Sequence, residues 1–140
     1  MQHKGSAIWS GDLKSGEGHV STESGALKDN AYGFKTRFED TPGTNPEELV
    51  GAALASCYAM AMSLGLGEKG LKADEIAAIA DVTLSKVDSG FAVTKVHLDV
   101  TAKIPGITAE DFQKVAEATK MNCPISKLLT AEITLDAKLK

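Results

Sequence analysis

The sequence predicts an α+β protein in which residues 1–140 form a single domain. Two regions, one near the N-terminus and one in the second half, alternate apolar and polar residues as strands do. Between them lies a long, strongly apolar segment with helical spacing, and a second helical pattern follows the last strands. The predicted order is three strands, a helix, two strands, two helices and a final strand.

The first 40 residues predict three short strands separated by turns. The strands cover residues 6–9, 19–22 and 32–38, and glycine, aspartate and asparagine mark the turns between them. In the third strand, alternation places Tyr32, Phe34, Thr36 and Phe38 on one face. Lys35 and Arg37 then share the opposite face.

Residues 46–67 predict a helix with a well-defined start. Asn45 can cap it, Pro46 suits the first helical position, and Glu48 stands at capping-box spacing from Asn45. One apolar stripe consists of Leu49, Ala53, Cys57, Met60 and Leu64, and the opposite side carries Ala55, Ala59, Met62 and Leu66. A helix that is apolar on nearly all sides is buried on most of them, so we expect a second subunit to cover part of this one.

The second half predicts a β-hairpin, two helices and a last strand. Residues 76–87 and 91–104 form the hairpin around a turn at residues 88–90. Thr108 can cap a helix that ends near residue 120, and a short helix over residues 124–129 follows Pro124. Residues 131–137 form the final strand.

Composition limits the classes of function. No run of about 18 apolar residues is present, so a membrane span is not expected, and the N-terminal residues lead into no apolar segment typical of a secretory signal. A formal net charge of −4 argues against a nucleic-acid-binding surface. We therefore expect a cytoplasmic protein.

The two cysteines are candidate redox residues. Cys57 alone, in the apolar stripe of a helix, is typical of a small buried side chain. Cys123 precedes Pro124 and so lies at the start of a short helix, where free N–H groups and the helix dipole favour a thiolate. Their separation of 66 residues neither supports nor excludes contact between them.

A reactive thiolate needs a neighbouring cation, and Arg37 is the only arginine of the chain. Glu47, in the first turn of the long helix, is free to hold it if Glu48 completes the capping box. Arg37 could instead simply reach solvent, and Glu47 could only compensate the helix dipole. His3, His19 and His97 have no metal-ligand spacing, and no phosphate-binding loop or nucleophile-elbow motif occurs.

Several segments together resemble the OsmC/Ohr family of thiol-dependent organic hydroperoxide reductases over essentially the whole chain. They are Val20-Ser21-Thr22-Glu23-Ser24-Gly25, Tyr32-Gly33-Phe34, Thr36-Arg37-Phe38, Gly43-Thr44-Asn45-Pro46-Glu47-Glu48-Leu49, Ala55-Ser56-Cys57, Lys86-Val87-Asp88, Gly90-Phe91, Cys123-Pro124 and Ala131-Glu132-Ile133-Thr134-Leu135.

The resemblance implies an intertwined α+β homodimer with long central helices packed on β-sheets. It implies that Cys57 is the peroxidatic cysteine, Cys123 the resolving cysteine, Arg37 the catalytic arginine and Glu47 the acid that orients it. The position of Arg37 favours the OsmC branch. No metal, haem or flavin is implied, and the Cys57–Cys123 disulfide would be reduced by an external thiol, lipoyl-type thiols included. An apolar wall around Cys57, from residues such as Met60 and Leu64, would favour organic hydroperoxides.

Two alternatives to an enzyme stay open: a redox sensor that uses the same disulfide as a switch, and a small-ligand binder in which Cys57 is only part of the core. The geometry of the long helix adds an expectation. Glu47 and Cys57 are ten residues apart, which is about 15 Å along a helix axis and roughly 80° in direction. We therefore expect two chains to share each active site, with a site built from one chain as the rival arrangement.

Overall fold

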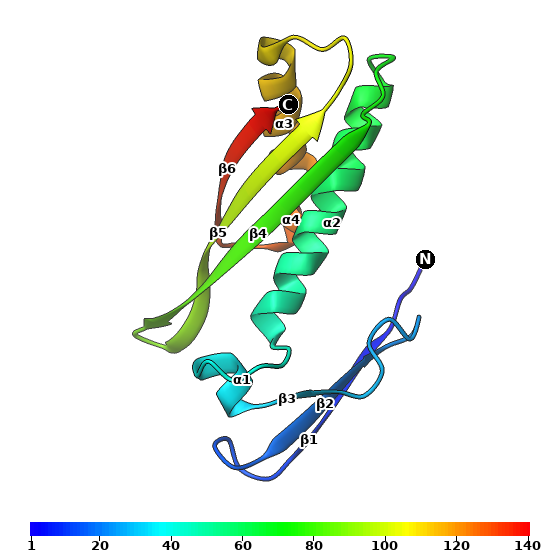
Figure 1. Ribbon diagram of the computed structural model, residues 1–140. Coiled ribbons are helices and arrows are strands. Elements are labelled where there is room, and N and C mark those ends of the chain that lie inside the picture. Colours follow the sequence, from blue (N-terminus) through cyan, green and yellow to red (C-terminus); the bar gives the residue numbers. More distant parts are fainter. The chain divides into compact units, whose positions relative to one another are not determined.

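A computed structural model describes all 140 residues (Figure 1). The chain divides into two compact units, residues 1–49 and residues 50–140. The expectation of one domain over residues 1–140 stays a prediction.

The first unit contains an antiparallel three-stranded sheet with the order β1-β2-β3. Its strands are β1 (Gly5–Ser10), β2 (Glu17–Thr22) and β3 (Asn30–Tyr32). In the register of the sheet, His19 pairs with Ile8 on one side and with Ala31 on the other. The two predicted strands at residues 6–9 and 19–22 are thus confirmed.

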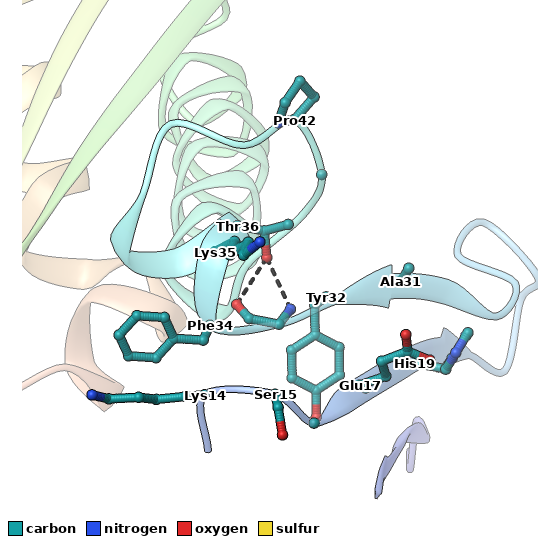
Figure 2. Close-up of a pocket in the computed structure, with 14 residues that line it drawn as sticks. Lys14, Ser15, Glu17, His19, Ala31, Tyr32, Phe34, Lys35, Thr36 and Pro42 are labelled. Carbon is teal, nitrogen blue, oxygen red and sulfur yellow. Dashed lines mark hydrogen bonds between the residues drawn. The ribbon is translucent and has the colours of Figure 1, made fainter. Parts of the chain in front are cut away.

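The predicted strand over residues 32–38 is wrong beyond Tyr32, because α1 (Phe34–Phe38) is a short helix. Thr36 closes its first turn: its hydroxyl accepts from the Gly33 N–H at 2.9 Å and donates to the Gly33 carbonyl at 3.1 Å (Figure 2). The rings of Phe34 and Phe38 lie 4.9 Å apart, at the i, i+4 spacing that a helix brings together. Arg37 therefore projects from a helix rather than from a strand.

The long helix α2 spans Pro46–Gly67, as predicted. The Glu48 N–H donates to Asn45 Oδ1 at 2.8 Å, which confirms Asn45 as the cap. The carboxylate of Glu48 accepts from the Thr44 hydroxyl at 3.3 Å, rather than from the Asn45 N–H as a capping box would require. Asn45 also donates through Nδ2 to the Thr36 carbonyl at 3.2 Å, which ties this cap to α1.

The second unit has a sheet with the order β4-β5-β6. β4 (Glu75–Val87) and β5 (Gly90–Lys103) form the predicted antiparallel hairpin, and Gly90 at φ +127° makes the turn. β6 (Glu132–Leu139) runs parallel to β5. The connection between these parallel strands consists of α3 (Ala109–Asn122), capped by Thr108 as predicted, and α4 (Pro124–Leu128) (Figure 1).

The core of the second unit lies between the sheet and the helices α2 and α3. Alternate residues of β5 face it, and α2 contributes one stripe of buried residues. The fully buried members from these two elements are Leu54, Tyr58, Met62, Leu66, Val96, Leu98, Val100 and Ala102.

The apolar stripe predicted through Cys57 is the one that the single chain leaves uncovered. Met60 is 76% exposed and Leu64 69% exposed, whereas Met62 and Leu66 of the opposite side are fully buried. The expectation that Met60 and Leu64 form an apolar wall around Cys57 stays a prediction.

The α2 helix is also long and apolar enough to satisfy the minimum requirements for a membrane span, with a mean hydropathy of 1.7. The sequence-based exclusion of such a segment was too strict, because it counted only unbroken apolar runs. Five α2 residues are buried: Gly51, Leu54, Tyr58, Met62 and Leu66. Four of these residues, Leu54, Tyr58, Met62 and Leu66, belong to the hydrophobic core of the second unit.

Candidate active site

The fold brings the two cysteines into contact. Cys57 lies in the middle of α2, Cys123 lies between α3 and α4, and their sulfur atoms are 2.8 Å apart as free thiols. Cys123 is fixed by the backbone on both sides. Its N–H donates to the Thr119 carbonyl at 2.9 Å, and its carbonyl accepts from the Lys127 N–H at 3.1 Å. The two sulfur atoms are thus placed for a disulfide.

The two thiols differ in access to solvent. Cys123 is fully buried, whereas Cys57 is partly exposed. An oxidant that arrives from solvent therefore meets Cys57 first. This asymmetry matches a division of labour in which one cysteine reacts with the oxidant and the other resolves the product.

The surroundings of the pair affect the two thiols in opposite directions. Burial raises the pKa of the Cys57 thiol, and the neighbouring Cys123 raises it further, while the Ile125 N–H opposes both effects. Burial also acts to raise the pKa of Cys123. Four groups act in the opposite direction: the Cys57 thiol, the Ser126 N–H, the Ser126 hydroxyl and the Ile125 N–H. Together they outweigh burial, so the pKa of Cys123 is lowered. Within this unit a thiolate is therefore better stabilised on Cys123 than on Cys57.

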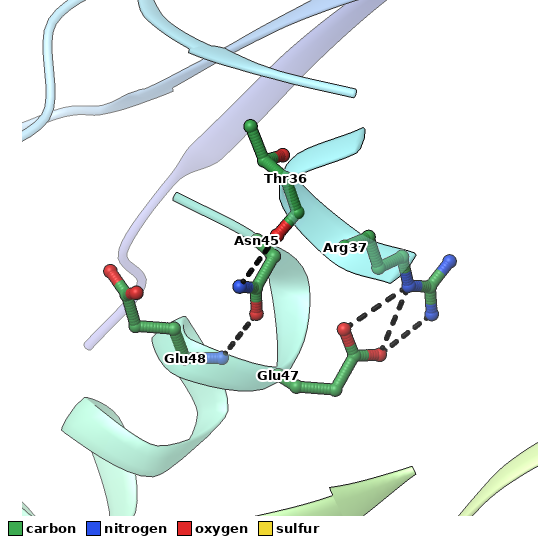
Figure 3. A network of polar contacts seen from close by, with 5 residues as sticks. All are labelled: Thr36, Arg37, Asn45, Glu47 and Glu48. Atoms are coloured by element: carbon green, nitrogen blue, oxygen red, sulfur yellow. Dashed lines mark hydrogen bonds and ion pairs between the residues drawn. The ribbon is translucent and has the colours of Figure 1, made fainter. Parts of the chain in front are cut away.

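Arg37 and Glu47 form an ion pair in the first unit (Figure 3). Arg37 Nη2 lies 2.7 Å from Glu47 Oε1, and Arg37 Nε lies 3.1 Å and 3.2 Å from the two carboxylate oxygens. The carboxylate is held at the first turn of α2 and is only 13% exposed. Two nitrogens of the guanidinium face Glu47, and the third points away from it, free to meet another anion (Figure 3).

The four residues singled out from the sequence thus form two pairs. Arg37 contacts Glu47, and Cys57 contacts Cys123. The first pair belongs to residues 1–49 and the second to residues 50–140.

A cleft of about 630 Å³ lies in the first unit (Figure 2). Tyr32 and Phe34 line it together with Lys14 and Lys35 from two sides. None of the four candidate residues is among those that line it.

The structure brings together no group of three or more His, Cys, Asp or Glu side chains that could hold a metal ion. The three histidines are separate. His97 hydrogen-bonds Thr134 Oγ1 at 2.7 Å, and His19 lies beside Asp29 at 3.3 Å.

Sequence reasoning missed Ser126. Its hydroxyl oxygen is buried without a hydrogen-bond partner, three residues after Cys123 in α4. A serine in a five-residue helix belongs to no recognisable motif. Only the position three residues beyond a candidate cysteine could have drawn attention to it.

Comparison with known proteins gives consistent matches. A family model described as OsmC-like protein matches residues 38–138. The chain is 55% identical over its full length to the peroxiredoxin OsmC of Escherichia coli and covers 98% of that protein. It is 26% identical over 88% of its length to the organic hydroperoxide resistance protein OhrB of Bacillus subtilis and covers 89% of it.

Solved structures agree on the fold. An OsmC-like protein from Vibrio cholerae superimposes with a TM-score of 0.79 at 19% identity, over 98% of this chain and 99% of the other. The crystal structure of OhrB from Bacillus subtilis superimposes with a TM-score of 0.68 at 22% identity, over 98% of both chains. The relatives named peroxiredoxin, together with the adjacent thiols, support cysteine-based peroxidase activity. The chain belongs to the OsmC-like protein family.

Proposed function

We propose that this protein reduces organic hydroperoxides to alcohols, with Cys57 as the peroxidatic cysteine and Cys123 as the resolving cysteine. The observation that carries the proposal is the pair of free thiols 2.8 Å apart, of which only Cys57 reaches solvent. The substrate class is carried over from relatives named for resistance to organic hydroperoxides.

In the first step the Cys57 thiolate attacks the outer oxygen of the hydroperoxide. The O–O bond breaks, the alcohol leaves after gaining a proton, and Cys57 becomes a sulfenic acid. Burial disfavours the charged form of Cys57, so this step needs a cation. We assign that role to Arg37, oriented by Glu47, because a fixed guanidinium can face a carboxylate and a thiolate together.

In the second step the Cys123 thiolate attacks the sulfur of the Cys57 sulfenic acid. The S–S bond forms, the S–O bond breaks, and hydroxide leaves and is protonated to water. An external dithiol then reduces the disulfide and is itself oxidised to a disulfide. Dithiols of the lipoyl type are the candidates that we would test first.

We propose that the working form is a homodimer. In the stripe of α2 that carries Cys57, Met60 is 76% exposed and Leu64 is 69% exposed. Exposing large apolar side chains side by side to water is unfavourable and marks an interaction surface. A second copy of α2 packed against Met60 and Leu64 would cover these two side chains and would give two equivalent sites.

The remaining expectations concern cofactor and location. The proposed chemistry uses sulfur alone, so it needs no metal, haem or flavin. We place the protein in the cytoplasm, because two cysteines are too few for the disulfide scaffold that is typical of small secreted proteins.

Steady-state kinetics test the proposal. The protein is mixed with cumene hydroperoxide and dihydrolipoamide, and alcohol formation is followed over many turnovers. We expect sustained turnover that Cys57→Ser abolishes, because a serine hydroxyl has no accessible anion near neutral pH. A redox sensor would react once and stop, and a ligand binder would lose no thiols. Either result contradicts the proposed function.

A further inference from the structure

The Ser126 hydroxyl is an unexplained polar group next to the cysteine pair. Ser126 is only 7% exposed, and its Oγ has no hydrogen-bond partner. A buried hydroxyl without a partner is costly, and in a native structure it calls for an explanation, of which a catalytic or redox role is one.

The local backbone limits what the hydroxyl can serve. Cys123 is the N-cap of α4 and Ser126 is the third residue of that helix. A side chain at this position reaches back toward the N-cap residue, where it ordinarily accepts from the N-cap N–H. That N–H is already engaged by the Thr119 carbonyl at 2.9 Å. Although burial raises the pKa of Cys123, the Ser126 hydroxyl is among the groups that lower it, so the sulfur of Cys123 lies within reach of this hydroxyl.

A neutral thiol is a weak acceptor, whereas a thiolate is a strong one. We propose that Ser126 is a positioning residue for the resolving step, in which its hydroxyl donates to the Cys123 thiolate and holds that sulfur toward Cys57. This inference rests on the proposed roles of the two cysteines. It explains why the hydroxyl lacks a partner while both thiols are neutral.

Ser126 adds no bond change to the resolving step. The Cys123 thiolate supplies the electron pair of the new S–S bond, hydroxide leaves Cys57, and the Ser126 proton stays on its own oxygen. Ser126 acts by increasing the fraction of Cys123 present as thiolate. It also keeps the anion in place during the attack.

Other groups also lie near Cys123. Cys57 and Tyr58 approach from α2, and burial, then Glu117 and Cys123, raise the pKa of Tyr58. Lys120 from α3 and Lys127 from α4 line a small surface cleft with Ser126, and Lys120 is paired with Glu117 at 2.8 Å. Burial raises the pKa of Cys123, and the Cys57 thiol, the Ser126 N–H, the Ser126 hydroxyl and the Ile125 N–H together lower it. The contribution of the hydroxyl has the sign that the proposal requires.

The first test measures Cys123 alone. In a Cys57→Ala background, the rate of alkylation by iodoacetamide is followed from pH 5 to pH 10. Ser126→Ala should lower that rate at pH 7 by about tenfold, the loss expected for one hydrogen bond to a charged group, and shift the profile to higher pH. Ser126→Thr should restore it. Leu128→Ala, which truncates an exposed side chain of the same helix, is the matched control and should leave the profile unchanged.

The second test uses the protein with both cysteines. After one equivalent of cumene hydroperoxide, Ser126→Ala should form sulfenic acid at the wild-type rate but form the disulfide about tenfold more slowly. Excess peroxide should then overoxidise Cys57 to sulfinic acid, as detected by mass spectrometry. Superimposable alkylation profiles for wild type and Ser126→Ala would overturn the proposal for Ser126. Failure of the peroxidase roles would appear separately, as wild-type protein that forms no disulfide.

Discussion

At the scale of single residues, the cysteine pair poses an electrostatic problem. Two thiols 2.8 Å apart cannot both be charged without strong repulsion, and burial raises the pKa of the one that solvent reaches. The groups at the start of α4 favour charge on Cys123 instead. A Cys57 thiolate ready to attack peroxide therefore needs a stabilising cation, and Arg37 is the residue that we propose for this role.

Replacing Arg37 with lysine tests the source of that cation. Lysine keeps the charge but loses the planar fork that faces Glu47 through two nitrogens. In a Cys123→Ser background, we expect the pKa of Cys57 to rise, because a cation that favours the thiolate is weakened. The alkylation rate at pH 7 should fall about tenfold or more, as a shift of one pKa unit implies.

Lys35→Ala removes the other cation of α1 and is the control. It should leave the alkylation profile of Cys57 unchanged. If Arg37→Lys gave the wild-type profile as well, Arg37 would have no part in activating Cys57.

The identity of the candidate site residues was predictable from the sequence, but which of them contact each other was not. Cys57, Cys123, Arg37 and Glu47 all stand out in the sequence, as unusual types or beside strong helix signals. The contact between the cysteines depends on how α3 and α4 return to α2, which a separation of 66 residues does not encode. Ser126 could not be found, because its interest lies in burial without a partner.

At the scale of elements, the helices with clear caps were predictable and α1 was not. Asn45 and Thr108 both cap helices, as their positions suggest. Residues 34–38 alternate as a strand would, and the alternation misled the prediction. The same residues also place Phe34 and Phe38 at helical spacing, and the hydrogen bonds between Thr36 and Gly33 decide in favour of the helix.

Two glycines of α2 give a matched test of how this helix packs on β4. A Cβ on Gly51 would lie 2.9 Å from the Ala80 carbonyl oxygen, whereas one on Gly65 would meet only Val115 at 3.8 Å. Alanine gains about 1 kcal/mol over glycine within a helix. For Gly51→Ala we expect a backbone clash of about 1–3 kcal/mol to exceed this gain.

Gly51→Ala should therefore lower the free energy of unfolding, and Gly65→Ala should raise it by about 0.5–1 kcal/mol. Urea denaturation of reduced protein measures both. An equal gain for the two variants would show that α2 does not approach β4 as closely as described.

Tyr58 gives a prediction about alkaline pH. Its hydroxyl donates to the Ala116 carbonyl at 2.9 Å, and burial, followed by nearby negative charge, raises its pKa above the ordinary value of 10.0. A folded-state pKa above the unfolded value means that this contribution to stability is complete below pH 10.0 and is lost as pH rises further.

Tyr58→Phe should cost about 1–2 kcal/mol near neutral pH, because the Ala116 carbonyl loses its donor. The variant should also lose less stability than wild type between pH 9 and pH 11, as thermal unfolding at each pH would measure. A constant difference in stability across that range would contradict the argument.

At the scale of the whole molecule, the uncovered apolar stripe of α2 points to a second subunit. Nearly uniform hydrophobicity around the helix indicated this from sequence. The structure shows that the side of α2 with Met62 and Leu66 is buried, and that the side with Met60 and Leu64 is exposed. The β4–β5 hairpin was predictable from its short turn. The parallel pairing of β5 with β6 was not, because a crossover through two helices leaves no local signal.

Subunit exchange tests whether two chains share each site. Glu47 and Cys57 are separated by ten residues of one helix, too far for Glu47 to support the chemistry of Cys57 directly. Mixing inactive Cys57→Ser with inactive Glu47→Ala should restore activity, since a heterodimer would then contain one site with both groups. Unmixed variants serve as controls. Confirmed exchange by mass spectrometry with no return of activity would mean that each site is built from one chain.

The central claim is that Cys57 takes the oxygen and Cys123 resolves the product. Its most direct test is a single turnover with one equivalent of cumene hydroperoxide, followed by mapping of the cysteines by mass spectrometry. The account predicts one equivalent of alcohol and a Cys57–Cys123 disulfide in wild type. It predicts a sulfenic acid on Cys57 in Cys123→Ser, and no alcohol from Cys57→Ser. Alcohol formation by Cys57→Ser, or wild type that consumes the peroxide while both thiols stay free, would contradict it.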